Sequence, residues 1–391
     1  MALQRLRGMQ LRMPNIKAPA FFKTPAVGLD IDRGAIKAVQ VSRSPRSFAL
    51  QHVGYRKLPS GAVSDGEVAD HDLLSYEIKE FWASHSFKGK AVYLGVANQK
   101  IVVRLLDFPR MSPAELRSSI GFEAQDHIPM PIDEAVLDYV VLGPQEEGSD
   151  LDRILIVAAQ QDMISRYSSA VRAAGLRPEG VDVKALSLLR STLPLSLIDD
   201  AGAILLLDIG AEITSLVVSQ SGTPTLTRFI PGGSGYLVQA VADAASLPEE
   251  EAERQLMNPK VRIEPGTEEE IGEIEGAEEE EEGDDFDPAL VYDIRHGLED
   301  AVQILAEDVE RSVEYHYSQP GSREVTQVFV SGEGALVNGL DVCLGDLLGI
   351  VTHRGTPLSK LTSNKSNVSD EQLRVMEPVL AVALGLALEE A

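Results

Sequence analysis

The sequence predicts an α/β protein with two lobes of related topology and a small α/β subdomain inserted in the first lobe. Two stretches of the same layout support this prediction, residues 27–41 (VGLDIDRGAIKAVQV) and residues 204–218 (ILLLDIGAEITSLVV). Each contains an apolar strand, an aspartate, a turn with glycine and a second strand, which is typical of a β-hairpin. A chain of 391 residues is long for one hydrophobic core, so a duplicated fold explains both the length and the repeat.

The turn of each hairpin is a candidate phosphate-binding loop. Asp30 and Asp208 end the first strands, and Gly34 and Gly210 lie in the turns that follow. Glycine has no Cβ, so backbone N–H groups can approach a phosphate there while an aspartate holds a metal ion through water. An ordinary hairpin turn, in which Asp and Gly are common for steric reasons, explains either stretch taken alone. The repetition favours two phosphate loops that face each other.

These hairpins resemble the two phosphate motifs of the actin-like ATPase superfamily, which includes actin, sugar kinases, heat-shock chaperone ATPases, FtsA and PilM. Residues 331–340 (SGEGALVNGL) resemble its adenosine motif, and residues 378–388 (PVLAVALGLAL) resemble its closing helix. Residues 228–235 (RFIPGGSG) resemble an element whose paired glycines bring a helix N-terminus close to the nucleotide, although a simple glycine-rich turn is the alternative. The resemblance implies an actin-like, ribonuclease H-like fold.

A middle segment narrows the resemblance to PilM proteins. Ser112, Pro113 and Glu115 form a capping box that opens a helix. The following residues, 118–142, contain an acidic residue and an Ile-Pro pair before a strand, as in PilM proteins. Residues 173–191 (AAGLRPEGVDVKALSLLRS) are also similar to PilM. FtsA and the kinases lack the middle segment in this form, so we expect a PilM-like protein.

The superfamily resemblance implies ATP and Mg²⁺ as ligands of the cleft, with Asp30 and Asp208 as metal ligands. The implied cofactor-binding residues are Asp30, Arg33, Gly34, Lys37, Asp208, Gly210, Thr214, Gly232, Gly233, Gly332 and Gly334. No catalytic residue can be assigned, because the region that faces the γ-phosphate in relatives falls only loosely near residues 182–184.

Three acidic residues depart from the superfamily pattern at this cleft. Asp32 stands where the first phosphate loop usually has glycine, Glu212 replaces a small residue in the second loop, and Glu333 replaces the second glycine of the adenosine-like turn. A carboxylate close to a triphosphate repels it unless Arg33 or a metal compensates. We therefore expect ATP binding to be weak or vestigial, and we do not expect a turning-over enzyme.

Composition sets further bounds. The net charge is −26, and 14 acidic residues with no basic ones lie in 264–288, so the rest carries −12. This acidic insertion has low hydrophobicity and is expected to be disordered, as a spacer or as a partner for basic patches or divalent ions. The sequence has no basic stripe for nucleic acid and no apolar run long enough to span a bilayer. One cysteine, Cys343, excludes an internal disulfide and fits a reducing cytosol.

The domain prediction divides the chain into consecutive parts. The first 25 residues carry five basic side chains and no acidic one, which suits either a disordered leader or a weakly membrane-binding segment. The predicted parts are a basic flexible segment (1–25), the first lobe (26–88 and 173–202), the inserted PilM/FtsA-type subdomain (89–172), and the second lobe (203–391) with its acidic insertion (264–288) and a final helix (375–391) that returns to the first lobe.

The resemblance to PilM implies a cytoplasmic scaffold, peripheral at the inner membrane, in the assembly platform of a type IV pilus or a type II secretion system. The implied partner is the N-terminal cytoplasmic peptide of a PilN-like bitopic membrane protein, bound in a groove formed with the inserted subdomain. The candidate partner-binding residues are Phe122, Glu123, Ile128, Pro129 and Tyr139.

Two alternative functions remain open at this stage. An active actin-like ATPase or kinase would need intact phosphate loops and a placed base. An FtsA-like division protein that forms filaments on the membrane would be expected to end in an amphipathic tail, whereas this sequence stops at Ala391, directly after the expected closing helix.

Overall fold

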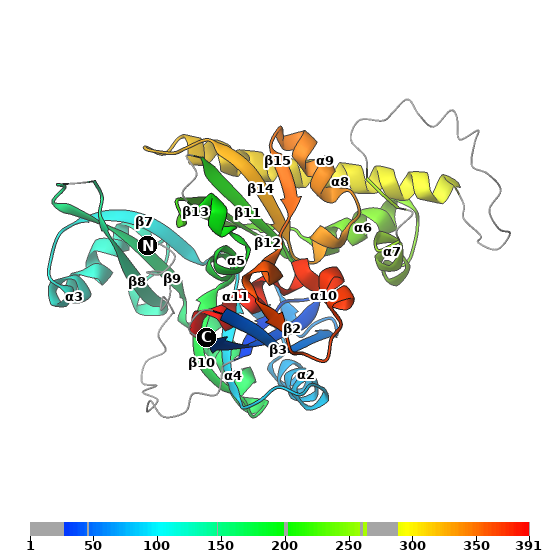
Figure 1. Cartoon of the computed structure of the whole chain (residues 1–391), viewed down its shortest axis with the longest axis horizontal. Coiled ribbons are helices and arrows are strands. Elements are labelled where there is room, and N and C mark those ends of the chain that lie inside the picture. The colour runs from blue at the N-terminus through cyan, green and yellow to red at the C-terminus, as the bar shows by residue number, and fades with distance from the viewer. Residues whose placement is uncertain are drawn as a thin grey trace.

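The computed structural model describes residues 27–44, 47–146, 148–198, 202–258, 261–263 and 288–390. These residues form two lobes and a smaller subdomain, each built on its own sheet (Figure 1). The predicted basic segment 1–25 and the acidic insertion, apart from Pro288, lie outside the described residues.

The first lobe contains a six-stranded sheet in the order β10-β6-β1-β2-β3-β16. Its strands are β1 (Val27–Ile31), β2 (Ala35–Ser44), β3 (Ser47–Lys57), β6 (Ala91–Val96), β10 (Arg177–Val183) and β16 (Ser363–Asn364). Strands β1 to β3 form an antiparallel meander, and β6 and β10 continue the sheet in parallel on the other side of β1. The short strands β4 (Val63–Ser64) and β5 (Glu67–Val68) pair separately, and the helices α2 (His71–Ser84), α4 (Gln161–Ala173) and α5 (Lys184–Thr192) complete the lobe.

The second lobe repeats this arrangement in the order β13-β12-β11-β14-β15. Its strands are β11 (Ala203–Ile209), β12 (Ile213–Gln220), β13 (Thr223–Pro231), β14 (Val325–Ser331) and β15 (Val351–Arg354), and its helices are α6 (Ser234–Ala244), α7 (Glu249–Leu256), α8 (Pro288–Tyr317) and α9 (Leu340–Leu348). An antiparallel meander is again followed by two parallel strands on the other side of the first strand. The predicted duplication is confirmed.

The inserted subdomain is a three-stranded antiparallel sheet, β7 (Val102–Pro109), β9 (Leu151–Gln160) and β8 (Ala135–Pro144), with β9 in the centre. Helix α3 (Pro113–Ala124) packs on one face of it, and the predicted capping box of Ser112 and Glu115 is present. The predicted range, 89–172, also includes β6 and α4. The structure places β6 between β1 and β10, because an apolar run buried on both faces suits a central strand.

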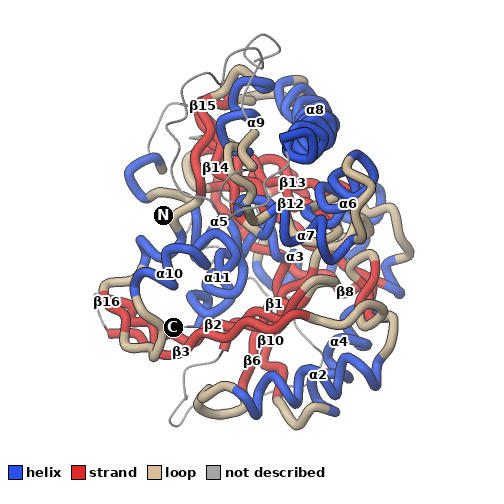
Figure 2. Tube along the Cα trace, turned by 90° about the vertical axis from the view of Figure 1, so that its right-hand side faces the viewer, coloured by secondary structure: helices blue, strands red, loops and turns tan. Residues whose placement is uncertain are grey.

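The C-terminal segment returns to the first lobe, where it lies on the face of β1–β3 opposite α2 and α4 (Figure 2). The single helix expected over 375–391 is divided into α10 (Asp370–Met376), the 3₁₀ turn η6 (Glu377–Leu380) and α11 (Ala381–Glu390). Pro378, which lacks a backbone N–H, lies at this division. Close approach requires glycine at Gly28 in β1, where a Cβ would lie 2.0 Å from the carbonyl oxygen of Ala383.

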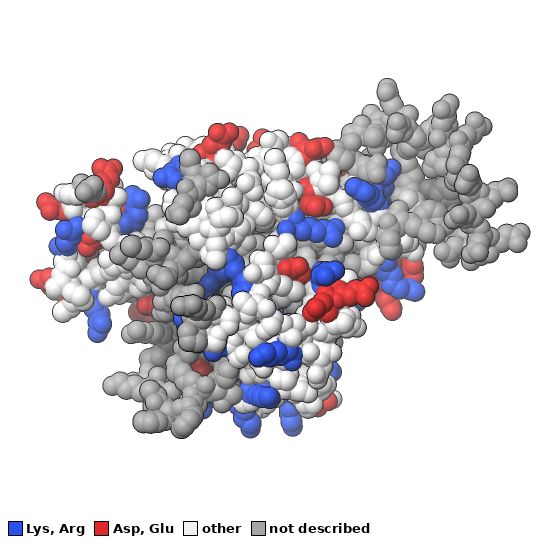
Figure 3. Space-filling view, in the orientation of Figure 1, with Lys and Arg blue, Asp and Glu red and all other residues white. Residues whose placement is uncertain are grey.

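Three further features of the structure concern membrane-spanning helices, surface charge and the cysteine. Among the described helices, none is both long and apolar enough to cross a membrane. On the face in Figure 3, basic side chains are interspersed with acidic ones and form no continuous stripe. Cys343 is buried, and burial raises the pKa of its thiol to about 11, as expected for an inert core cysteine.

Replacing residues 264–287 with a short Gly-Ser linker is expected to leave the fold intact. The deletion removes 14 acidic side chains and spares both the buried Ile263 and helix α8. Relief of charge repulsion offsets any loss of contacts, so the melting temperature should stay the same or rise slightly. A variant that keeps the segment but replaces its acids by Gln controls for charge, and a loss of several degrees on deletion would contradict this prediction.

Candidate functional site

The two Asp-tipped hairpins meet between the lobes. Asp30, the next-to-last residue of β1, lies directly opposite Lys37 of β2, and Asp208 in β11 lies opposite Ser215 of β12. The cavity between the loops has a volume of only about 20 Å³ and is lined by residues of both lobes, among them Asp32, Lys184 and Asp208. This volume holds about one water molecule. The common cleft predicted for Asp30 and Asp208 therefore exists, but protein atoms fill most of it.

The carboxylate of Asp32 takes the donors that a phosphate would use in the first loop. Its Oδ1 accepts hydrogen bonds from the backbone N–H groups of Gly34 at 2.9 Å and Ala35 at 3.0 Å. Its Oδ2 accepts a hydrogen bond from Lys37 Nζ at 2.5 Å. The loop therefore binds an anion that belongs to its own chain.

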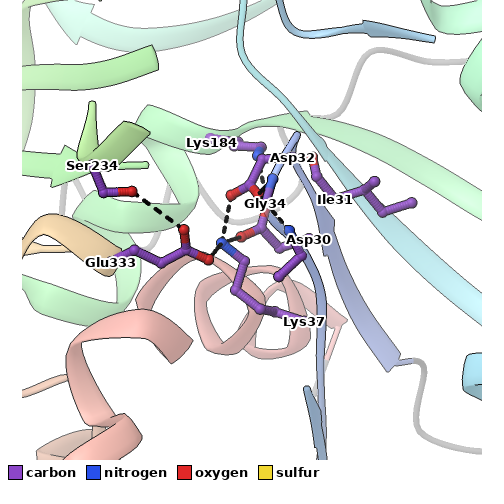
Figure 4. A network of polar contacts seen from close by, with 9 residues as sticks. Asp30, Ile31, Asp32, Gly34, Lys37, Lys184, Ser234 and Glu333 are labelled. Carbon is purple, nitrogen blue, oxygen red and sulfur yellow. Dashed lines mark hydrogen bonds and ion pairs between the residues drawn. The ribbon is translucent and has the colours of Figure 1, made fainter. Parts of the chain in front are cut away.

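Lys37 is the centre of a buried ion-pair network (Figure 4). Besides Asp32, its ammonium group lies 3.3 Å from Asp30 Oδ2 and 3.7 Å from Glu333 Oε1. Its side chain is only 3% exposed. Burial favours the neutral amine, but the surrounding carboxylates outweigh it and hold the pKa of Lys37 well above its usual value. Lys37 is therefore charged and fully engaged by carboxylates.

A second lysine occupies the other side of Asp30. Lys184, the first residue of α5, lies with its Nζ 2.6 Å from Asp30 Oδ1 and donates a hydrogen bond to the carbonyl oxygen of Ile31 at 2.9 Å. It also lines the small cavity together with Asp208. An ammonium group therefore lies where a divalent ion would have to join the two aspartates.

The pKa shifts reflect this crowding of charge. Burial and the nearby Asp30 raise the pKa of Asp208 to about 7, although Lys37 and Lys184 act in the opposite direction. Burial also raises the pKa of Glu333 in spite of Lys37. For Asp32, the nearby Lys37 and Lys184 outweigh burial and lower the pKa. Lysine contacts thus keep Asp32 ionised, whereas Asp208 is close to protonation at neutral pH.

The second phosphate loop reaches across to the first lobe through Glu212. Its Oε1 lies 3.5 Å from Arg33 Nε, and its Oε2 accepts a hydrogen bond from the backbone N–H of Asp65 at 2.7 Å. The buried Thr214 donates a hydrogen bond from its hydroxyl to the carbonyl oxygen of Gly232 at 2.8 Å, within the same lobe. Thr214 therefore fixes the turn after β13.

The remaining glycines of the predicted site serve close packing in the second lobe. A Cβ at Gly233 would lie 2.0 Å from the carbonyl oxygen of Gly210, and a Cβ at Gly334 would lie 2.4 Å from the side chain of Ile209. Gly332 has a φ of +85°, which other residues rarely adopt. These glycines shape the two turns, whether or not a nucleotide is bound.

The adenosine-like turn borders an open cleft of about 560 Å³. Its apolar walls come from α6, α7 and the C-terminal segment, and they include Val238, Leu256 and Val379. Glu333 separates this cleft from the phosphate loops, since its carboxylate lies near Lys37 and accepts a hydrogen bond from Ser234 Oγ at 3.4 Å.

The residues present do not fit ATP with Mg²⁺. Asp32 takes the loop donors, Lys184 pairs with the metal-ligand candidate Asp30, and the space between the loops is about one water in size. The site holds more negative than positive charge even before a triphosphate enters. Its carboxylates are Asp30, Asp32, Asp208, Glu212 and Glu333, and its cations are Arg33, Lys37 and Lys184.

The predicted partner-binding residues lie in the inserted subdomain, well separated in sequence and sheet from this cleft. Phe122 of α3 is 79% exposed, and Glu123 and Pro129 are also exposed. Tyr139 is half-buried in β8, whereas Ile128 is only 6% exposed and packs in the core of the subdomain. Ile128 therefore supports the subdomain instead of presenting a contact surface.

The resemblance placed residues 182–184 only loosely near the γ-phosphate, and it did not predict that Lys184 pairs with Asp30. The part that Asp65 plays in the site was missed. Nothing in the sequence around Asp65 pointed to its N–H, since any residue offers this group.

Comparisons with known proteins agree with the two-lobed fold described above. The family of the type IV pilus assembly protein PilM matches residues 28–264 and 274–391. A chain of a solved PilM-PilN type IV pilus biogenesis complex shares 28% sequence identity with a TM-score of 0.78, over 94% of this chain and 98% of that chain. Ethanolamine utilization protein EutJ from Carboxydothermus hydrogenoformans has 15% identity and a TM-score of 0.52, over 95% of this chain and 92% of that chain.

MreB5 of Spiroplasma citri bound to ADP has 11% identity and a TM-score of 0.51, over 93% of this chain and 96% of that chain. These likenesses show the actin-like two-lobed α/β fold that the paired hairpins predicted. Because the family match covers nearly the whole chain, this protein belongs to the PilM family of type IV pilus assembly proteins.

Proposed function

We propose that this protein is a cytoplasmic scaffold of the type IV pilus assembly platform, peripheral at the inner membrane, and that it binds the N-terminal cytoplasmic peptide of a PilN-like bitopic membrane protein. The observation that carries this proposal is the 28% identity over 94% of the chain to a protein solved in a PilM-PilN complex. The main role is binding, with no turnover of ATP.

The charges of the cleft support a role that does not depend on nucleotide. MreB5 of Spiroplasma citri has a similar fold and was solved with ADP. In this chain, Asp32 and Glu333 replace the glycines of the superfamily pattern, and both are paired with Lys37. Any ATP binding is therefore weak, and the ATPase and kinase alternatives find no support in the site.

The surface proposed for the partner is the outer edge of β8 together with the end of α3. Among the described strands, only β9 pairs with β8, so its other edge is open to an added strand. A Cβ at Gly121 would lie 3.8 Å from Ile132 in the 3₁₀ turn (Ile132–Glu134) that leads into β8, so the end of α3 lies beside this turn. Phe122, which follows Gly121 in α3, is a large exposed apolar side chain, as expected of an anchor for a peptide.

The Phe122→Ala variant is expected to weaken binding of a PilN-like N-terminal peptide by at least about tenfold, because loss of an aromatic anchor typically costs 2 kcal/mol or more. Isothermal titration of the full chain with the synthetic peptide measures this effect.

Tyr76→Ala is the matched control, because Tyr76 is an exposed aromatic residue on α2 of the first lobe. It should leave the affinity unchanged. Equal affinities of the unaltered protein and the Phe122→Ala variant would remove Phe122 from the binding surface, and absence of any peptide binding would contradict the proposed function itself.

A further inference from the structure

Two of the three acidic residues that depart from the superfamily pattern, Glu212 and Glu333, pair with residues of the other lobe. Arg33 in the first loop pairs with Glu212 in the second loop, and Lys37 pairs with Glu333 of the adenosine-like turn. Each pair has its cation in the first lobe and its carboxylate in the second. Such placement is expected of residues that hold the lobes together, since either carboxylate alone would only repel a nucleotide.

We infer that these four residues, Arg33, Lys37, Glu212 and Glu333, form a charge clasp that holds the lobes closed in place of a nucleotide and its metal ion. The inference concerns the conformation of this chain and does not depend on the pilus partner proposed above.

Two residues beside the clasp, Asp32 and Lys184, provide the charges that a bound ligand would supply. Asp32 provides the anion that the loop N–H groups of Gly34 and Ala35 require. Lys184 provides the cation beside Asp30, at 2.6 Å. Since the loop N–H groups and the Asp32 carboxylate have partners within the chain, the first loop requires no added anion.

Residues of the two lobes also pack closely against each other across the cleft. A Cβ at Gly34 would lie 3.0 Å from Glu333 Oε2 and 3.1 Å from Ala211 Cβ, both in the second lobe. Glu212 also accepts the backbone N–H of Asp65, on the rim of the first lobe, at 2.7 Å. An exposed ion pair such as Arg33–Glu212 contributes little stability by itself. The buried ion pair between Lys37 and Glu333 and the direct contacts between the lobes therefore contribute most of the free energy that holds the lobes closed.

The distance between the lobes tests the clasp. Spin labels at Lys79→Cys on α2 and Glu310→Cys on α8 report it, since both positions are exposed and lie in different lobes. We expect one short distance distribution that ATP with Mg²⁺ does not change. The isosteric double variant Glu212→Gln with Glu333→Gln should shift the distribution to longer distances. The matched control is Glu249→Gln with Glu371→Gln, two surface carboxylates outside the cleft, which should not shift it.

Charge-reversal variants distinguish the loss of the ion pair between Arg33 and Glu212 from a general loss of stability. Arg33→Glu should lengthen the distance, and adding Glu212→Arg should shorten it again, because the pair is restored with opposite polarity. Hydrogen exchange gives a second readout without labels. Glu212→Ala removes the acceptor of the Asp65 N–H, so exchange in residues 63–68 should accelerate about tenfold.

Two results would overturn the clasp. One is a distance in the unaltered protein that shortens when ATP and Mg²⁺ are added, which would mean that the nucleotide closes the lobes. The other is a Glu212→Gln with Glu333→Gln variant, folded by circular dichroism, that keeps the distance and exchange of the unaltered protein.

Discussion

The Lys37→Met variant is expected to lose about 3–5 kcal/mol of unfolding free energy, the usual cost of removing one partner from a buried ion pair. Methionine keeps the length and packing of the side chain but leaves Asp30, Asp32 and Glu333 without the cation that lies 3.3, 2.5 and 3.7 Å from them. Urea unfolding of the nucleotide-free protein measures this loss.

Lys57→Met on the neighbouring strand β3 is the matched control. Its side chain is 66% exposed and pairs with Glu253 at the rim of the cleft, so its loss should cost at most about 1 kcal/mol. If both variants unfold at the same urea concentration, Lys37 is not held by the carboxylates of the folded chain and would be free to bind a phosphate.

The second large effect is a gain of affinity. Changing Asp32→Gly together with Glu333→Gly is expected to strengthen ATP binding on the order of a hundredfold. At an effective dielectric constant of about 20, a carboxylate roughly 4 Å from a phosphate charge costs on the order of 4 kcal/mol. The ion pairs with Lys37 offset part of this cost, which is why we expect less than the full effect.

The charge-only variant, Asp32→Asn with Glu333→Gln, separates the two causes. It removes the repulsion but keeps the bulk and the occupied loop donors, so its gain should be much smaller than that of the glycine variant. Equal gains would assign the effect to charge alone, and no gain in either variant would show that these two side chains do not block the nucleotide.

Local patterns in the sequence were enough to predict the elements that frame the site. The apolar runs on either side of the Asp- and Gly-containing turns predicted both hairpins, and the spacing of Ser112 and Glu115 predicted the start of α3. These features depend on neighbouring residues, so a single sequence contains the information. The predicted limits of the inserted subdomain were less accurate. The sequence identifies β6 as a strand but does not show which sheet it joins.

The chemistry of the cleft was predicted only in part. Asp32, Glu212 and Glu333 were identified as acidic departures that we expect to oppose ATP binding, but most of their partners were not predicted. Glu212 meets Arg33 and Asp65 only because the lobes close on each other, and Lys184 meets Asp30 only because β10 and β1 end at the same edge of the sheet. Contacts between distant segments follow from topology, which local patterns do not specify.

Isothermal titration of the unaltered protein with ATP and Mg²⁺, repeated with the PilN-like peptide, tests the central claim most directly. We predict ATP binding weaker than about 1 mM, no change on Asp208→Ala, and the same peptide affinity with and without nucleotide. Micromolar ATP binding that Asp208→Ala abolishes would contradict the account and indicate a conventional nucleotide switch.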